Sequence, residues 1–122
     1  RVLIPLVFGD RRKLTPAVYR QYLAPLARME DRHGLFAFAE QVFAGSAWCD
    51  ELWARRAALK GMPAAIVWGM RDPLFGRRFL ARWREALPAA EVTTLPKAGH
   101  FVQEEEPAAV SAALRRLLAT PA

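Results

Sequence analysis

The first half of the chain carries apolar residues at helical spacing. Thr15 and Pro16 are suited to the N-cap and the first turn of a helix. An apolar stripe then follows in steps of three, one and three residues: Tyr19, Tyr22, Leu23 and Leu26. This spacing predicts an amphipathic helix within residues 13–26.

Two further helices are predicted before residue 62. One spans Gly34 to Gly45 and is bounded by those two glycines. The next follows Ser46, which the pattern places at the N-cap, and stops at Gly61. Residues 1–62 are therefore predicted to be helical, with no strand.

The pattern changes in the second half of the chain. "AAIVWG" (64–69) is a short apolar run ended by glycine, which is typical of a strand buried on both faces. An amphipathic helix is predicted over 76–88, and the β-branched "EVTTLP" (91–96) predicts a second strand. A loop then leads to a last helix over 107–119. The residues expected to face inward are Phe79, Leu80, Trp83 and Leu87 on the first of these helices and Val110, Leu114, Leu117 and Leu118 on the last.

Strand, helix, strand and helix in this order indicate an α/β fold with parallel strands and right-handed crossovers. We expect short parallel strands with flanking helices over residues 63–122, preceded by the helical segment of residues 1–62. Two parallel strands make a poor sheet by themselves, because such sheets are normally buried on both faces and built from several strands.

Composition limits the chain to one modest globular domain. It has 122 residues, of which 53% are hydrophobic and 25% charged. No apolar run approaches the roughly 18 residues of a membrane-spanning helix, and the opening "RVLIPLVFGD" lacks the small-residue cleavage site of a signal peptide. Cys49 is the single cysteine, so a reducing, cytoplasmic location is expected.

The net charge of +6 raises the question of an acidic partner such as nucleic acid. The arginines are scattered over the polar faces of several predicted helices, however, and no zinc-finger, RNA-binding or helix-turn-helix signature accompanies them. We therefore interpret them as solvated helix faces and expect neither a nucleic-acid nor a membrane partner.

Two ionisable residues follow the predicted strands. Asp72 lies three residues beyond Gly69, and His100 lies five residues beyond Leu95. Because the carboxyl ends of adjacent parallel strands meet at one edge of a sheet, where active sites gather, we expect the two side chains to touch. A carboxylate that accepts from one imidazole nitrogen fixes the tautomer and leaves the other nitrogen free to act as a base.

Each of these residues has a structural alternative. Asp72 precedes a proline, a pair that often begins a helix, and a single loop histidine is commonly structural or solvent-exposed. The joint placement, with Gly99 allowing a close approach just before His100, favours a functional pair.

The stretches "IVWGMRDPLFG" (66–76) and "LPKAGHFVQEEEP" (95–107) resemble the C-terminal part of α/β-hydrolases, most closely the haloalkane dehalogenase-like branch. In that family the triad runs nucleophile, acid, histidine along the chain. The acid follows a strand ending in W-G or a similar pair, and the histidine follows A-G or G-A. The resemblance implies that Asp72 is the triad acid and His100 the triad base.

The resemblance also implies a place in a larger fold. It is strong over residues 63–119 and looser over residues 1–62, which look like the later helices of the family's cap. We expect residues 63–122 to form the C-terminal βαβα part of an α/β-hydrolase core. The family's central strands and oxyanion-hole loop would precede residue 1.

The family's nucleophile sits on a sharp strand-to-helix turn, G-x-S-x-G or its aspartate equivalent, and no stretch of this sequence has that form. The residues considered and set aside are Asp10, Ser46, Cys49 and Ser111. Cys49 is expected to pack rather than react. We therefore expect a hydrolase portion that lacks the nucleophile and is inactive alone, whether as a truncated product, a proteolytic fragment or one part of a divided protein.

In the dehalogenase branch a carboxylate displaces halide and the histidine then activates water against the resulting ester. The resemblance implies a small apolar substrate, halogenated ones included, and no cofactor or metal. Leu74, Phe75 and Phe101 are the predicted substrate-binding residues, with helix packing as the alternative. Trp48 and Trp53 are expected in the core rather than at a halide site.

Two alternatives stay open. A serine esterase or epoxide hydrolase of the same fold would use the same acid and base, so the missing nucleophile alone would decide between them. A non-catalytic binding or oligomerising fragment is the other alternative, because uncovered strand edges and helix faces recruit partners. We expect a homo-oligomer or a complex with the missing N-terminal half.

Overall fold

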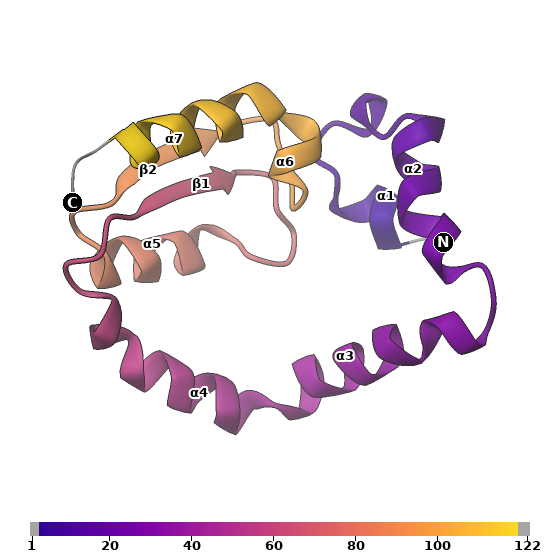
Figure 1. Ribbon diagram of the computed structural model, residues 1–122, viewed down its shortest axis with the longest axis horizontal. Coiled ribbons are helices and arrows are strands. Elements are labelled where there is room, and N and C mark those ends of the chain that lie inside the picture. The colour runs from indigo at the N-terminus through magenta and orange to yellow at the C-terminus, as the bar shows by residue number, and fades with distance from the viewer. Residues whose placement is uncertain (1–2, 120–122) are drawn as a thin grey trace.

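Two parallel strands lie at the centre of the second half of the chain (Figure 1). The strand β1 (Ala65–Gly69) pairs with β2 (Glu91–Leu95), so that Ile66 lies opposite Val92 and Gly69 opposite Leu95. The computed structural model describes residues 3–119. Residues 1–2 and 120–122, and the side chains of Leu3, Val42, Phe43 and Ser46, lie outside that description.

Helices flank these strands on opposite sides (Figure 1). The helix α5 (Arg77–Ala86) connects β1 to β2, and α7 (Pro107–Ala119) covers the other side. The buried apolar residues of this part are Ile66, Leu80, Ala98 and Ala113. The predicted parallel α/β arrangement is therefore confirmed.

Two details of this part differ from the prediction. The segment predicted as a loop contains a short helix, α6 (Val102–Glu105). On α7, Leu114 and Leu118 do not face inward: they are 52% and 83% exposed, and Ala113 is buried instead. Because α7 packs on β1 through a small residue, the larger leucines beside it are left at the surface.

The N-terminal segment packs on the βα part. It comprises the short helix α1 (Leu3–Val7), a 3₁₀ turn (Arg11–Lys13) and α2 (Pro16–Leu23). The Thr15 hydroxyl accepts the N–H of Val18 at 3.2 Å, which confirms the predicted N-cap. Within this segment, Val7 and Phe8 are buried against the loop that follows β2.

The remaining helices form an arc that projects from this body (Figure 1). They are α3 (His33–Ala44) and α4 (Ser46–Ala54), with 3₁₀ turns at Ala24–Leu26, Glu30–Arg32 and Arg55–Leu59. The predicted N-cap of α4 is wrong by one residue: Gly45 occupies that position and Ser46 is already helical. The arc meets α5 where Trp53 and Trp83 stack edge to face, with ring centroids 5.1 Å apart.

The arc leaves large apolar side chains at the surface. Those on its two helices are Leu35, Phe36, Phe38, Trp48 and Leu52, each 46% exposed or more. The whole chain exposes 9296 Å², against roughly 6,600 Å² for a folded monomer of this mass. The fold therefore leaves uncovered surface on a scale comparable with an interface between proteins.

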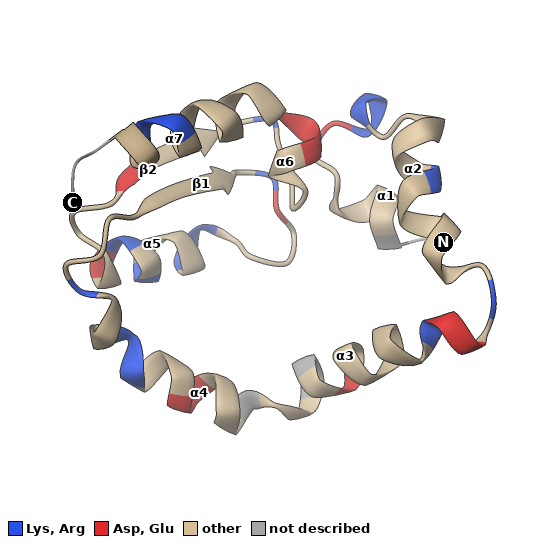
Figure 2. Cartoon of the chain, viewed as in Figure 1, with Lys and Arg blue, Asp and Glu red and all other residues tan. Residues whose placement is uncertain are grey.

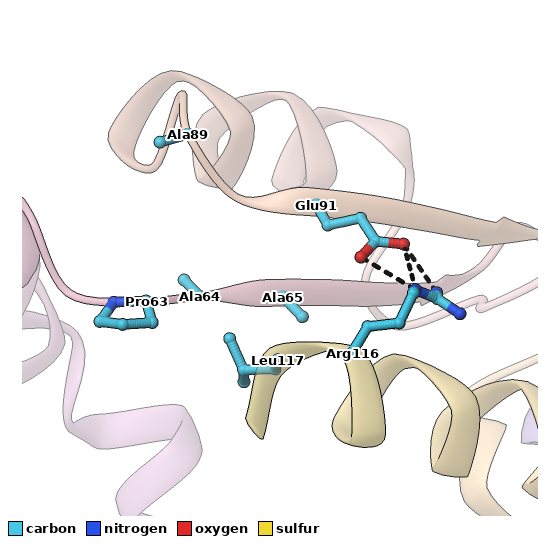
Figure 3. A pocket seen from close by; sticks show the side chains of 7 residues that line it. All are labelled: Pro63, Ala64, Ala65, Ala89, Glu91, Arg116 and Leu117. Atoms are coloured by element: carbon cyan, nitrogen blue, oxygen red, sulfur yellow. Dashed lines mark hydrogen bonds and ion pairs between the residues drawn. The ribbon is translucent and has the colours of Figure 1, made fainter. Parts of the chain in front are cut away.

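Charged residues are distributed over the whole molecule. Lys and Arg lie on α2, α5 and α7, in the 3₁₀ turns and in several loops, without one continuous block (Figure 2). At the amino ends of the strands, Arg116 of α7 meets Glu91 of β2 at 2.7 Å, beside a small hollow (Figure 3). The hydrogen bond from Arg116 lowers the pKa of Glu91.

Across residues 3–119, none of the helices combines the length and apolar character that crossing a membrane requires.

Candidate active site at the strand tips

The loops after β1 and β2 are held together by backbone hydrogen bonds. The N–H of Met70 donates to the carbonyl of Leu95 at 3.0 Å, and the N–H of Arg71 donates to the carbonyl of Ala98 at 2.9 Å. These bonds continue the parallel pairing beyond the last strand residues. The two loops that carry the predicted site residues therefore run side by side.

Asp72 and His100 meet where these loops end. The distance from Nδ1 of His100 to Oδ2 of Asp72 is 2.9 Å, so the predicted contact is confirmed. The Asp72 side chain is only 9% exposed, and that of His100 is 30% exposed. Because a carboxylate can only accept, the pair places the ring proton on Nδ1. Within residues 3–119, Nε2 has no hydrogen-bond partner and is left as the basic nitrogen.

The second carboxylate oxygen of Asp72 binds backbone N–H groups, as the alternative of a helix-capping aspartate predicts. Its Oδ1 accepts the N–H groups of Leu74 at 2.8 Å and Phe75 at 3.0 Å. These bonds hold a turn rather than a helix, because α5 begins at Arg77 with Gly76 as its N-cap. One oxygen thus fixes the carboxylate to its own loop, and the other is directed at the histidine.

Glycines permit the close approach of three backbone segments at this point. A Cβ on Gly69 would lie 2.0 Å from the carbonyl oxygen of Gly99, and a Cβ on Gly99 would lie 2.3 Å from that of Val7. Side chains cannot occupy such spaces without moving the backbone. The prediction that Gly99 allows a tight approach before His100 is therefore confirmed.

A small hollow of about 180 Å³ lies beside the pair. It is lined by Val67, Trp68, Gly69, Asp72, Phe75, Gly99, His100 and Val102. Of the three predicted substrate-binding residues, only Phe75 is in this lining, with its ring centroid 5.5 Å from that of His100. Leu74 is 48% exposed, and Phe101 stacks on Phe8. A substrate-binding role for Leu74, Phe75 and Phe101 stays a prediction.

The sequence did not point to the most buried charged residue of this region. Glu105 is 1% exposed, and its carboxylate accepts three backbone N–H groups, those of Gly9, Asp10 and Gly99. Nothing in the run of three glutamates distinguishes Glu105 from its neighbours, because its partners lie mostly at the other end of the chain. Its role becomes visible only in the folded structure, where Gly9 and Asp10 reach it.

A second glutamate of the run joins α6 to α2. The hydroxyl of Tyr22 donates to Oε1 of Glu104 at 2.8 Å, and its ring packs edge to face on Phe101. Burial and the bond to Glu104 raise the pKa of the Tyr22 phenol. This contact is a further link between the N-terminal segment and the histidine loop.

A larger hollow of about 690 Å³ lies between α3 and α4 and shares no lining residue with the hollow beside the pair. It is lined by Ala37, Phe38, Gln41, Trp48 and Cys49. The expected core position of Trp48 is wrong, since this side chain is 64% exposed, and Cys49 is exposed rather than packed. This hollow contains no acid–base pair, so the strand tips are the better candidate despite their smaller cavity. Residues 3–119 hold no cluster of three or more metal-ligand side chains.

Two known enzymes are similar to this chain over most of its length, and a putative hydrolase is similar over almost half of it. Cis-3-alkyl-4-alkyloxetan-2-one decarboxylase of Xanthomonas campestris pv. campestris is 34% identical over 117 residues, which cover 90% of this chain and 38% of that protein. Haloalkane dehalogenase 2 of Mycobacterium tuberculosis is 30% identical over 115 residues, covering 92% of this chain and 39% of that protein. Putative hydrolase LipZ of the same organism is 41% identical over 56 residues, 46% of this chain and 19% of that protein.

The chain thus spans about two fifths of the length of the first two relatives. A sequence model described as the alpha/beta hydrolase family matches residues 2–113. That match includes both strands and the loops that carry Asp72 and His100. This chain belongs to the alpha/beta hydrolase family.

Proposed function

We propose that Asp72 and His100 are the acid and the general base of a hydrolase that acts like a haloalkane dehalogenase, cleaving a carbon–halogen bond by hydrolysis. The observation that carries the proposal is the 2.9 Å contact between Asp72 and Nδ1 of His100, beside a mostly apolar hollow. With the ring proton held on Nδ1, the basic Nε2 is available to take a proton from water.

In this proposal the nucleophile belongs to a segment outside these 122 residues. Among the described residues that line the hollow there is no serine, threonine or cysteine, and Asp72 is already engaged by His100. The hollow of about 180 Å³ is also smaller than the roughly 300 Å³ at which ligand pockets begin. Further residues would complete its walls, and the chain alone is expected to be inactive.

A chimera tests this proposal. The chain replaces the matching 39% of haloalkane dehalogenase 2, and halide release from a short bromoalkane is measured. The chimera is expected to release halide, and His100→Ala to lower kcat by about 10³-fold. Asp72→Asn should lower kcat strongly as well, because the wrong tautomer is then favoured.

The matched control is His33→Ala, which removes the chain's other histidine at the exposed start of α3 and should leave kcat unchanged. The proposal fails if the kcat of the His100→Ala chimera is as high as that of the His33→Ala chimera. It fails equally if the isolated 122-residue chain releases halide at a rate that His100→Ala does not reduce.

A second candidate is the decarboxylation of cis-3-alkyl-4-alkyloxetan-2-ones. The observation in its favour is the similarity to the Xanthomonas enzyme, 34% over 90% of this chain. A chimera with the front part of that enzyme should lose carbon dioxide release on His100→Ala if the chain supports this reaction. Which of the two chimeras is active would decide between the reactions.

We also propose that the uncovered apolar surface of α3 and α4 is covered by a partner, either a second copy or a segment that supplies the missing core strands. The exposed area of 9296 Å² supports this, because a monomer of this mass exposes roughly 6,600 Å². Light scattering of the purified chain should show an oligomer. A monomer at all concentrations would remove the second copy as the partner.

A further inference from the structure

Glu105 is a buried carboxylate that the proposed chemistry does not use. It follows His100 by five residues, at the end of the short helix α6, and is the most buried charged residue described. A buried carboxylate is costly unless hydrogen bonds compensate it. Its two oxygens do receive such bonds, and the donors come from two segments that are far apart in sequence.

The first donor belongs to the histidine loop. Oε1 of Glu105 accepts the N–H of Gly99, the residue directly before His100, at 2.7 Å. The N–H of His100 itself donates to the carbonyl of Val7 at 2.8 Å. On the other side of His100, the ring of Phe101 stacks on Phe8 with centroids 5.3 Å apart. The histidine is thus held by both of its neighbours in the chain.

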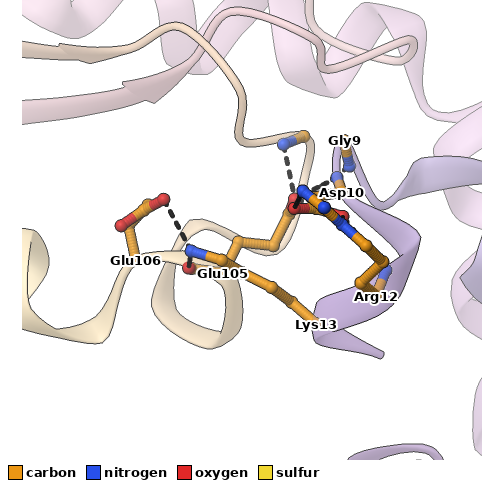
Figure 4. Close-up of polar contacts among 7 residues, drawn as sticks. Gly9, Asp10, Arg12, Lys13, Glu105 and Glu106 are labelled. Atoms are coloured by element: carbon orange, nitrogen blue, oxygen red, sulfur yellow. Dashed lines mark hydrogen bonds and ion pairs between the residues drawn. The ribbon is translucent and has the colours of Figure 1, made fainter. Parts of the chain in front are cut away.

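The other two donors belong to the N-terminal segment. Oε1 also accepts the N–H of Gly9 at 3.1 Å, and Oε2 accepts the N–H of Asp10 at 2.8 Å (Figure 4). The side chain of Asp10 is directed to Arg12, which lowers the pKa of Asp10 to about 2. Lys13 donates to the backbone carbonyl of Glu105 and to Glu106. The two bonds to Glu105 are the ones that fix the backbone of Gly9 and Asp10 behind the histidine loop.

The same N-terminal segment reaches the loop of the acid. The guanidinium of Arg71, which precedes Asp72, donates to the carbonyl of Gly9 at 3.3 Å. Gly9 therefore links the two loops: its N–H donates to Glu105, which also binds Gly99, and its carbonyl accepts from Arg71 beside Asp72. Productive acid–base geometry needs side chains fixed within roughly 0.5 Å.

We propose that Glu105 is the positioning residue of the Asp72–His100 pair, holding the N-terminal segment against the histidine loop so that Nδ1 of His100 stays on the Asp72 carboxylate. The inference rests on the proposed role of this pair, but its test needs no turnover. Failure of the catalytic proposal and failure of this one can therefore be told apart.

The test compares the imidazole tautomer of His100 by long-range ¹H–¹⁵N NMR in the wild-type chain and in Glu105→Gln. A glutamine keeps one acceptor oxygen for Gly99, but its amide N–H₂ then faces the N–H of Asp10, where two donors meet. We expect the single Nδ1–H form of the wild type to be replaced by a mixture of both tautomers.

Two controls separate positioning from stability alone. Glu106→Gln removes a neighbouring carboxylate that is 38% exposed and should leave His100 unchanged. Leu80→Ala destabilises the fold from α5, away from the histidine loop, and should also leave the tautomer unchanged while the protein is folded. An unchanged His100 signal in Glu105→Gln, or the same change in Leu80→Ala, would overturn the proposal.

If Glu105→Gln does not fold, amide hydrogen exchange in the wild-type chain tests the same proposal. The amides of Gly99 and Asp10 should exchange as slowly as those of β1, because they are bonded to a buried carboxylate. Rapid exchange at these two amides would show that Glu105 does not hold the loop, and the proposal would be wrong.

Discussion

Helices are predicted from the sequence in both the βα part of the molecule and the helical arc, but a buried apolar core is present only in the first. Around the strands, Ile66, Leu80 and Ala113 are at most 9% exposed. On the arc, Phe38 and Trp48 are 67% and 64% exposed. The sequence therefore predicts a helix in both regions, but it does not say what covers the apolar residues of that helix.

The two regions also differ in how they are held. The strand tips and the N-terminal segment are joined by hydrogen bonds between residues far apart in the chain, including those of Glu105 to Gly9 and Asp10. The arc is joined to the body mainly through Trp53 and Trp83. The Asp72–His100 pair at the strand tips is thus held by contacts within this chain, whereas the arc is suited to contact something outside it.

Truncating one apolar residue in each region should give the largest contrast. Leu80→Ala removes a side chain that is 6% exposed and should lower the free energy of unfolding by about 3 kcal/mol. Phe38→Ala removes a side chain that is exposed in the single chain, and should change the free energy of unfolding of the monomer by less than about 0.5 kcal/mol. Urea unfolding of both variants at decreasing protein concentration measures the difference. A loss at Phe38 as large as that at Leu80 in the dilute monomer would contradict the contrast, whereas a loss that grows with protein concentration would show that a second copy covers the arc.

A glycine-to-alanine pair should have opposite effects in the two regions. In Gly99→Ala the new Cβ would meet backbone atoms at 2.3 Å and 2.5 Å, so a loss of about 2 kcal/mol is expected. Gly34 lies in α3 with nothing within 4 Å of such a Cβ, and Gly34→Ala should stabilise the helix by about 0.5 kcal/mol. Thermal unfolding of each variant measures both signs. Equal shifts would refute the difference in packing.

The strand-tip prediction succeeded because it depended on local patterns and one general rule. The apolar runs that end at Gly69 and Leu95 identify the strands, and parallel pairing then brings Asp72 and His100 together. Glu105 could not be predicted, because its role depends on Gly9 at the opposite end of the chain. The exposure of Trp48 was missed for a related reason, since periodicity does not reveal whether a partner face exists.

A smaller effect is expected from the link between the N-terminal segment and α6. The Tyr22 phenol has a pKa raised above its ordinary value of 10.0, so the stabilisation from its bond to Glu104 is complete below pH 10. It is lost as the pH rises through the raised pKa. Tyr22→Phe should cost about 1 kcal/mol near neutral pH, and the gap to the wild type should close above pH 10. Unfolding curves for both proteins across this range test it; a gap that does not depend on pH would contradict the link.

The most direct measurement of the central claim is the long-range ¹H–¹⁵N NMR spectrum of the two histidines near neutral pH. His33 is exposed and serves as the reference within the same spectrum, because a free imidazole favours the Nε2–H tautomer. His100 is predicted to be in the Nδ1–H form and to lose this preference in Asp72→Asn. A His100 with the tautomer balance of His33, unchanged by Asp72→Asn, would show that the carboxylate and the imidazole do not meet.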